Sequence, residues 1–314
     1  MSSREERIAR VAERQHSIFT RSQAASCGFS HDEVDGRLAR GLWIRLHCSV
    51  YRIAGGPLTF DGRVLAAVLA GGAGAYASHT TAALRYCFER IEDRTLRITV
   101  PRSRRVVIPG VVVHQSTIAW GVTKVGRIPV TAPTRTLIEI AGLVGAAELE
   151  DALDDIWRRH IVTIKGCLEA LDRIGPARGT RILRKLLYER VGERPSGSGR
   201  ENATRRLLEA AGLPRPERQT VIRDEDGVGL ARPDLVYPDV KIAIEFDSTK
   251  WHGSRESLAR DHARQNRLSA AGWLVFVADD NQLMHPERFV ANVRRAFTAR
   301  GTAKARLKTK RTAR

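Results

Sequence analysis

The protein has 314 residues, of which 42% are hydrophobic and 28% are charged. This is enough chain for two or three domains, and it is too apolar for a disordered protein. Its 53 Lys and Arg exceed its 35 Asp and Glu, which gives a formal net charge of +18. Such an excess favours polyanionic partners; a charge run that only keeps the chain in solution is the alternative.

The cysteines and the apolar segments indicate the cellular compartment in which the protein resides. Cys27, Cys48, Cys87 and Cys167 form no CxxC pair and no zinc-site spacing, so they are typical of reduced thiols in the cytoplasm. The most apolar segment, residues 64–77, is too short and too rich in glycine to span a bilayer, and no signal sequence precedes it. The sequence predicts a soluble cytoplasmic protein with no membrane partner.

Residues 1–56 show the pattern of a winged helix-turn-helix. Helical spacing predicts helices over residues 4–19 and 20–27, and a third helix from Ser30 to Arg40 that Gly41 ends. Residues 42–53 alternate in polarity, which predicts a strand pair. In a winged helix the third helix enters the major groove of DNA and the wing touches the backbone.

The stretch TRSQAASCGFSHDEVDGRLARGLWIRLHCSVYRIAG resembles the winged-helix domain of AbiEi-type antitoxins and related actinobacterial regulators. The resemblance implies DNA as a partner, and the candidate contacts are Arg37, Arg40, Arg45 and Arg52. Asp32, Glu33 and Asp35 lie on the front half of the third helix, where they would repel phosphate. A winged helix that contacts protein is therefore the alternative.

Residues 57–191 are expected to form a central α+β domain. We expect helices over 61–69, 134–143 and 148–158, and strands over 95–100 and 106–114. The stretches PRSRRVVIPGVVVHQS and IPVTAPTRTLIEIA resemble the region that follows the winged helix in the same antitoxin-like proteins. GGAGA lacks the GK[ST] of a phosphate loop. His79 and His114 are isolated in the sequence, which predicts ordinary hydrogen-bonded histidines.

A linker over residues 192–199, GERPSGSG, separates these regions from an α/β domain over residues 200–299. We expect a helix over 200–211, strands over 219–223, 230–236 and 241–246, a helix over 254–271 and a strand over 273–277. Residues 300–314 form a basic tail with seven Lys or Arg and no Asp or Glu. Such a tail adds affinity for nucleic acid that does not depend on sequence.

Three carboxylates are expected to converge in this last domain. Successive side chains of a strand face opposite ways, so Glu245 and Asp247 share one side of their strand. Asp234 lies near the end of the neighbouring strand. Like charges in one place are unfavourable unless a cation offsets them. Hard oxygen ligands suit Mg²⁺ or Mn²⁺, so the sequence predicts a divalent metal site.

The order PD, then IEFDSTKWH, then Asp261, Arg264, Leu268, Gly272 and Trp273, resembles the PD-(D/E)xK nuclease superfamily, and within it the very-short-patch-repair (Vsr) endonucleases. The resemblance implies a restriction-endonuclease-like fold. It implies metal ligands at Asp234, Glu245 and Glu201, further catalytic positions at Asp247, Lys250 and His252, and a phosphate contact at Arg264. Asp247 stands where the superfamily has lysine, so Lys250 or His252 would have to stabilise the transition-state charge.

Taken together, the sequence predicts a DNA-binding protein whose C-terminal domain hydrolyses phosphodiester bonds with Mg²⁺. The alternative is an antitoxin-like transcriptional regulator whose nuclease-like domain has no activity. A homodimer and a cognate toxin partner are both left open.

Overall fold

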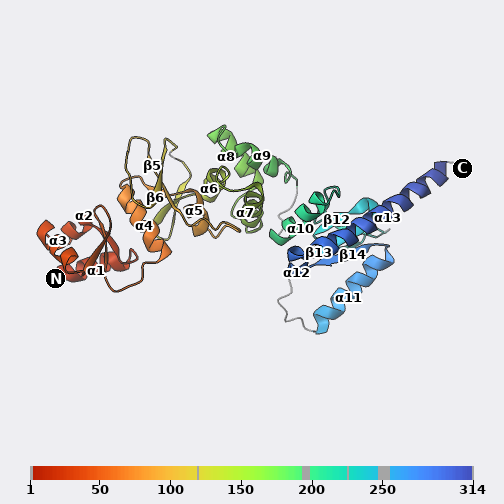
Figure 1. The fold of residues 1–314 in the computed structure, drawn as a ribbon, viewed down its shortest axis with the longest axis horizontal. Coiled ribbons are helices and arrows are strands. Elements are labelled where there is room, and N and C mark those ends of the chain that lie inside the picture. Colours follow the sequence, from red (N-terminus) through yellow and green to blue (C-terminus); the bar gives the residue numbers. More distant parts are fainter. Residues whose placement is uncertain (1–2, 119, 193–198, 225, 247–254, 313–314) are drawn as a thin grey trace. The chain divides into compact units, whose positions relative to one another are not determined.

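The computed structural model describes residues 3–118, 120–192, 199–224, 226–246 and 255–312, and the chain divides into two compact units, residues 1–191 and 192–314 (Figure 1). Each unit has its own hydrophobic cores. The two are described separately below. In the part of the chain that the structure describes, no helix combines the length and the apolar character that crossing a membrane requires.

The N-terminal segment has the element order of a winged helix. It comprises α1 (Arg4–Glu13), β1 (Ile18–Thr20), α2 (Arg21–Ser26), α3 (His31–Ala39), β2 (Trp43–His47) and β3 (Val50–Ile53). The expected helix over residues 4–19 is wrong at its end, because α1 stops at Glu13 and β1 pairs antiparallel with β3. The pairing buries Phe19 completely, against Trp43 at 4.7 Å between ring centroids. This long-range burial outweighs the helical spacing of the sequence.

Capping boxes start the three helices. Ser3, Thr20 and Ser30 each accept a hydrogen bond from the backbone N–H three residues on, and the residue there bonds back. The predicted cap at Ser30 and the predicted strand pair are confirmed. Sequence signals that act within four residues therefore placed α2, α3 and the wing correctly.

The rest of the N-terminal unit is a mixed sheet with helices. Its elements are α4 (Phe60–Gly71), β4 (Tyr76–Ala77), α5 (His79–Arg85), β5 (Leu96–Pro101), β6 (Val111–Ser116), β7 (Val122–Val125), β8 (Ile128–Thr131), α6 (Pro133–Ile140), α7 (Ala146–Arg158), α8 (Ile164–Ile174) and α9 (Thr180–Tyr188). The strand order is β6-β5-β4-β8-β7, with β5 and β6 parallel and β4 and β8 parallel. The expected strand over 106–114 begins only at Val111, after a turn at Gly110, where φ is 76°.

Two cores hold this region in place. One joins Ile18 and Val50 of the N-terminal segment to α4 and to Ile98 and Val130 of the sheet, and α4 contacts both sheets (Figure 1). The other packs α5 to α9 together around Leu137, Leu153, Leu171, Leu183 and Leu187. The helices α8 and α9 were not among the predicted elements; the end of α8 and the connection between the two helices line part of the cavity described below.

The C-terminal unit is a small α/β layer. It comprises α10 (Gly199–Ala210), β9 (Glu217–Arg218), β10 (Ile222–Arg223), β11 (Gly229–Ala231), β12 (Leu235–Tyr237), η1 (Pro238–Val240), β13 (Ile242–Phe246), α11 (Arg255–Ala270), β14 (Leu274–Ala278), α12 (Asp280–Met284) and α13 (Glu287–Thr312). The sheet order is β14-β13-β12-β9, with only β13 and β14 parallel among these pairs. The helices α10 and α13 pack on one face and α11 on the other.

Three predicted elements of this unit need correction. The strand expected over 219–223 is formed only over Ile222–Arg223, as β10, which pairs with β11; β9 lies just before that range and joins the main sheet. The strand expected over 230–236 is split into β11 and β12. Pro233 lies between them, and proline lacks the N–H that a continuous ladder needs. Residues 300–312, expected as a tail, continue the helix α13.

Candidate functional site

Two acidic residues of α3, the third helix of the N-terminal segment, form ion pairs with arginines. Glu33 lies 2.6 Å from Arg4 and also accepts from the backbone N–H of Ser30, and these contacts lower its pKa. Asp35 pairs with Arg21. Two of the three acids that argued against phosphate binding are thus offset by cations of the same segment.

The four candidate DNA-contacting arginines lie in different surroundings. Arg37 pairs with Glu5 and stacks on Phe29 and Trp43, so that only 13% of its side chain is exposed. Arg40 is exposed and donates to the carbonyl of Gly36 in its own helix. This geometry makes Arg37 part of the packing of the segment and leaves Arg40 on its surface.

The wing presents the other two arginines. Arg45 is exposed on β2, with its guanidinium 6.0 Å from the centre of the Tyr51 ring. Arg52 lies on β3 and donates to the carbonyl of Gly56. The strand pair therefore carries two cations, on the wing that the prediction places against the DNA backbone. Their contact with DNA stays a prediction.

Two of the predicted carboxylates of the C-terminal unit lie across from each other. The register pairs Leu235 with Ile244, so one further step places Asp234 opposite Glu245, on the same face of the sheet. Ile242 and Ile244 pack in the core on the other face, with Phe246 beside them. The prediction that alternation turns Glu245 away from that core is confirmed.

Asp234 is held by neutral donors. Gln219 Nε2 donates to its Oδ1 at 2.7 Å, and the backbone N–H of Phe246 donates to its Oδ2 at 2.8 Å. The same Gln219 amide lies 3.5 Å from Glu201 Oε2 at the start of α10. Gln219 therefore bridges two of the predicted metal ligands, and the sequence reasoning did not single it out.

Glu245 is held by a cation. Arg264 of α11 donates to Glu245 Oε2 at 2.9 Å, and the two side chains are 35% and 14% exposed. Arg264 was expected to steady a phosphate, and here it neutralises a predicted metal ligand. Within the described side chains, no group of three or more His, Cys, Asp or Glu is arranged to hold a metal ion. Asp247, Lys250 and His252 lie outside the described residues, and the metal site stays a prediction.

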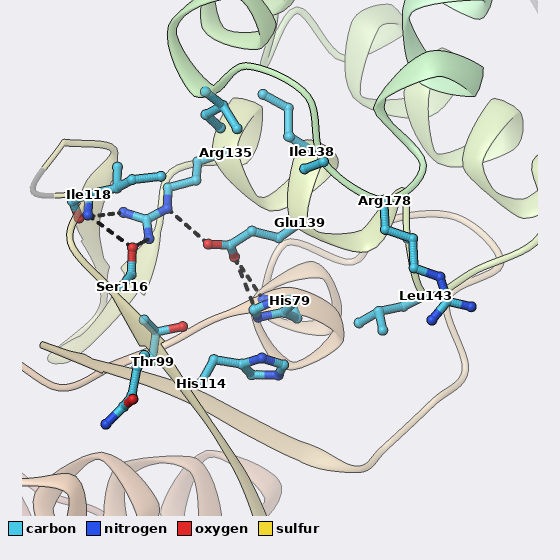
Figure 2. Close-up of a pocket in the computed structure, with 14 residues that line it drawn as sticks. His79, Thr99, His114, Ser116, Ile118, Arg135, Ile138, Glu139, Leu143 and Arg178 are labelled. Carbon is cyan, nitrogen blue, oxygen red and sulfur yellow. Dashed lines mark hydrogen bonds and ion pairs between the residues drawn. The ribbon is translucent and has the colours of Figure 1, made fainter. Parts of the chain in front are cut away.

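A cavity of about 320 Å³ opens in the central region of the N-terminal unit. Figure 2 shows its polar wall, where Arg135 and Glu139 of α6 meet His79 at the start of α5. Its lining residues are His79, Thr99, His114, Gln115, Ser116, Ile118, Arg135, Ile138, Glu139, Gly142, Leu143, Ile174, Ala177 and Arg178. They come from β5, β6, α5, α6 and the α8–α9 connection, so the cavity exists only in the folded chain.

Arg135 is buried, with 2% of its surface exposed, and all three of its nitrogens have partners. Nε donates to Glu139 Oε1 at 2.9 Å, and Nη1 donates to the carbonyls of Ile118 and Trp120. Nη2 donates to the Tyr76 hydroxyl at 2.7 Å. Glu139 also accepts from the backbone N–H of His79 at 3.0 Å. Burial raises the pKa of Glu139, and Arg135 and this N–H oppose the rise.

His79 and His114 stack on each other with their ring centres 3.8 Å apart and an angle of 18° between the planes. Burial, with nearby cations, lowers the pKa of His79 to about 3 and lowers that of His114 as well. His79 Nδ1 lies 2.9 Å from Ser78 Oγ and 3.8 Å from Glu139 Oε2. Both imidazoles are therefore neutral near pH 7, and the second distance is not an ion pair.

The histidines were predicted as isolated and ordinary. His79 does have a hydrogen-bond partner, but His114 Nε2 is buried and has none among the described residues. The two positions are 35 residues apart in the sequence, so no local pattern joins them. Only the parallel pairing of β5 with β6, and of β4 with β8, brings them together with α6.

Residues 6–54 match the protein family described as "Transcriptional regulator, AbiEi antitoxin". This match confirms the AbiEi-like resemblance of the N-terminal segment. The chain is also similar to two uncharacterized proteins of Mycobacterium tuberculosis, MT2308 of strain CDC 1551 / Oshkosh and Rv2248 of strain ATCC 25618 / H37Rv. Each is 28% identical over 267 residues, which cover 85% of this chain and 96% of the relative. The Vsr-like resemblance of the C-terminal unit stays a prediction.

Proposed function

We propose that the protein is a DNA-binding transcriptional regulator of the AbiEi antitoxin type, which docks on duplex DNA through α3 and the wing. The observation that carries the proposal is the element order of residues 4–53, together with the family match over residues 6–54. The pairing of Glu33 with Arg4 and of Asp35 with Arg21 supports it, since it removes most of the repulsion that acids on α3 would cause. A toxin partner belongs to the same proposal.

The test is a gel-shift titration of the full chain on the DNA upstream of its own gene, at several salt concentrations. Arg45→Ala and Arg40→Ala remove exposed cations of the wing and of α3, and Arg181→Ala on α9 is the matched control. Each lost phosphate contact should reduce the slope of log affinity against log salt by roughly 0.9. Equal slopes for all three variants and the unchanged protein would show that α3 and the wing do not dock on DNA.

A second candidate function is hydrolysis of phosphodiester bonds by the C-terminal unit with Mg²⁺ or Mn²⁺. It is favoured by the position of Asp234 opposite Glu245, with Gln219 linking Asp234 to Glu201. Asp234, Glu245 and Glu201 would hold the ion, which would polarise a phosphate and lower the pKa of an attacking water. Arg264 donates to Oε2 of the same Glu245, so the ion and this guanidinium would compete for that carboxylate.

A cleavage assay separates the two functions. Plasmid and single-stranded DNA are incubated with the full chain and Mg²⁺ or Mn²⁺. Metal-dependent cleavage should disappear in Asp234→Asn and in Glu245→Gln, while Asp239→Asn, an exposed acid of η1, should cleave normally. DNA binding in the gel shift without any cleavage would leave the regulator as the function.

A further inference from the structure

The central cavity has the composition of a small-molecule site. Its apolar lining residues are Ile118, Ile138, Leu143 and Ile174, and polar side chains line the rest; Figure 2 shows Ile118, Ile138 and Leu143 at different places around the polar groups. A volume of about 320 Å³ falls within the range of roughly 300 to 1,000 Å³ that such sites occupy. Neither the DNA-binding surface nor the carboxylates of the C-terminal unit use any of these residues.

The charges of the lining residues do not cancel. Arg135 and Glu139 neutralise each other at 2.9 Å, and His79 and His114 are neutral. Arg178 is exposed and forms no ion pair with any carboxylate among the described residues. One positive charge therefore remains at the cavity, which suits a ligand with a single negative charge.

The fold fixes Arg178 at this place by close backbone contact. Gly179 has a φ of +80°, and a Cβ built there would lie 1.9 Å from the carbonyl oxygen of Ala141. A Cβ on Gly142 would lie 2.9 Å from the carbonyl oxygen of Arg178. Two glycines thus let the start of α9 pack directly on the end of α6, and they bring Arg178 to the cavity.

A second polar residue that lines the cavity, His114, has a nitrogen that is unpaired among the described side chains. His114 Nε2 is buried without a hydrogen bond among the described residues, and leaving such a group unpaired is costly. A metal ion does not fit, because stacked rings only 18° from parallel direct their nitrogen lone pairs side by side rather than at one point. A hydrogen-bonding group of an organic ligand fits once the His114 ring turns toward the cavity, because Nε2 is buried in this structure.

We propose that this cavity binds a small organic monocarboxylate, whose carboxylate pairs with Arg178. The apolar body of this ligand contacts the isoleucine and leucine side chains that line the cavity. A hydroxyl or similar polar group on that body completes the hydrogen bonding of His114. A phosphate dianion is disfavoured, because Arg178 is the one lining cation that another described side chain does not already neutralise.

The test is isothermal titration of the full chain with hexanoate, benzoate and 4-hydroxybenzoate, with neutral 4-hydroxybenzamide as the uncharged counterpart. At least one carboxylate should bind with a Kd below about 1 mM. 4-Hydroxybenzoate should bind more tightly than benzoate, and 4-hydroxybenzamide about tenfold or more weakly than 4-hydroxybenzoate, since the charge-assisted pair is lost.

Variants assign the binding to the cavity. Arg178→Ala should weaken carboxylate binding about tenfold or more, Arg178→Lys should retain most of it, and Leu143→Trp should block it by filling the space. Arg181→Ala, an exposed arginine three residues away, is the matched control and should bind normally. The proposal is wrong if none of the three carboxylates binds, or if Arg178→Ala and Leu143→Trp both bind like the unchanged protein. DNA binding plays no part in this readout, so its failure and that of the regulator proposal are independent.

Discussion

The central cavity and the strand-end carboxylates hold their buried charges in different ways. In the cavity, Glu139 is paired with the buried guanidinium of Arg135 at 2.9 Å. At the strand ends, Asp234 is held by an amide and a backbone N–H, which are neutral donors. Asp234 therefore has no cationic partner among the described residues, whereas the cavity is left with the positive charge of Arg178. The cavity therefore suits the organic anion proposed above, whereas the metal ion at the strand ends stays a prediction.

The largest expected effect is at the buried ion pair of the cavity. Arg135→Met removes the cation and leaves Glu139 buried beside neutral groups, so the free energy of unfolding should fall by about 3 to 5 kcal/mol. Urea unfolding measures it. Adding Glu139→Gln should recover part of the loss, because the buried charge is then gone. If the double variant loses the sum of the two single losses, the pair is not coupled as described.

The second largest effect is expected at the packing that fixes Arg178. Gly179→Ala should cost more than about 2 kcal/mol of unfolding free energy, because the new methyl group meets the carbonyl of Ala141 as well as an unfavourable φ. Gly41→Ala has a φ of +70° with nothing within 4 Å, so it should cost only about 1 kcal/mol. Thermal unfolding compares the two, and equal losses would mean that α6 and α9 do not approach this closely.

At the strand ends the expected change is smaller. Asp234→Ala leaves the N–H of Phe246 and the amide of Gln219 without their acceptor, which should cost about 1 to 3 kcal/mol. Asp226→Ala, at an exposed position of the turn between β10 and β11, should stay within about 0.5 kcal/mol. Hydrogen exchange at the Phe246 amide gives a local measure, and unchanged protection there would contradict the contact.

The smallest expected effect is the loss of stability on moderate acidification. Burial lowers the pKa of His79 from 6.5 to about 3, so between these values the unfolded chain takes up a proton that the folded chain refuses. Stability from this group is complete above pH 6.5 and falls as the pH drops, by at most about 1.4 kcal/mol per pH unit. His114 acts in the same direction, and Glu139, whose pKa is raised from 4.5, acts in the opposite one.

Replacing the histidine isolates its share of the acid response. His79→Asn tolerates the local φ of 54° and does not titrate. Its unfolding midpoint in urea should therefore fall less than that of the unchanged protein when the pH is lowered from about 6.5 to about 5. Parallel curves for the two proteins would show that His79 is not buried in its neutral form.

Predictions from the sequence were reliable where the signal was local. Ser30 and Gly41 bound the third helix, and the alternation of residues 42–53 predicted the wing. Alternation on β13 also turned Glu245 away from the core of Ile242 and Ile244. The same reasoning failed over residues 14–19, where the pairing of β1 with β3 takes the chain out of the helix. No local pattern distinguishes those two outcomes.

The sequence by itself thus determined the capped helices, the wing, the face of Glu245 and the surplus of positive charge, because each depends on residues a few positions apart. Only the tertiary structure decided that Gln219 bridges Glu201 to Asp234, that Arg37 packs inward, and that His79, His114, Glu139 and Arg178 surround one cavity. These groups are separated by up to about a hundred residues along the chain. What joins them is strand pairing and backbone contact, which are non-local and are settled by burial rather than by sequence spacing.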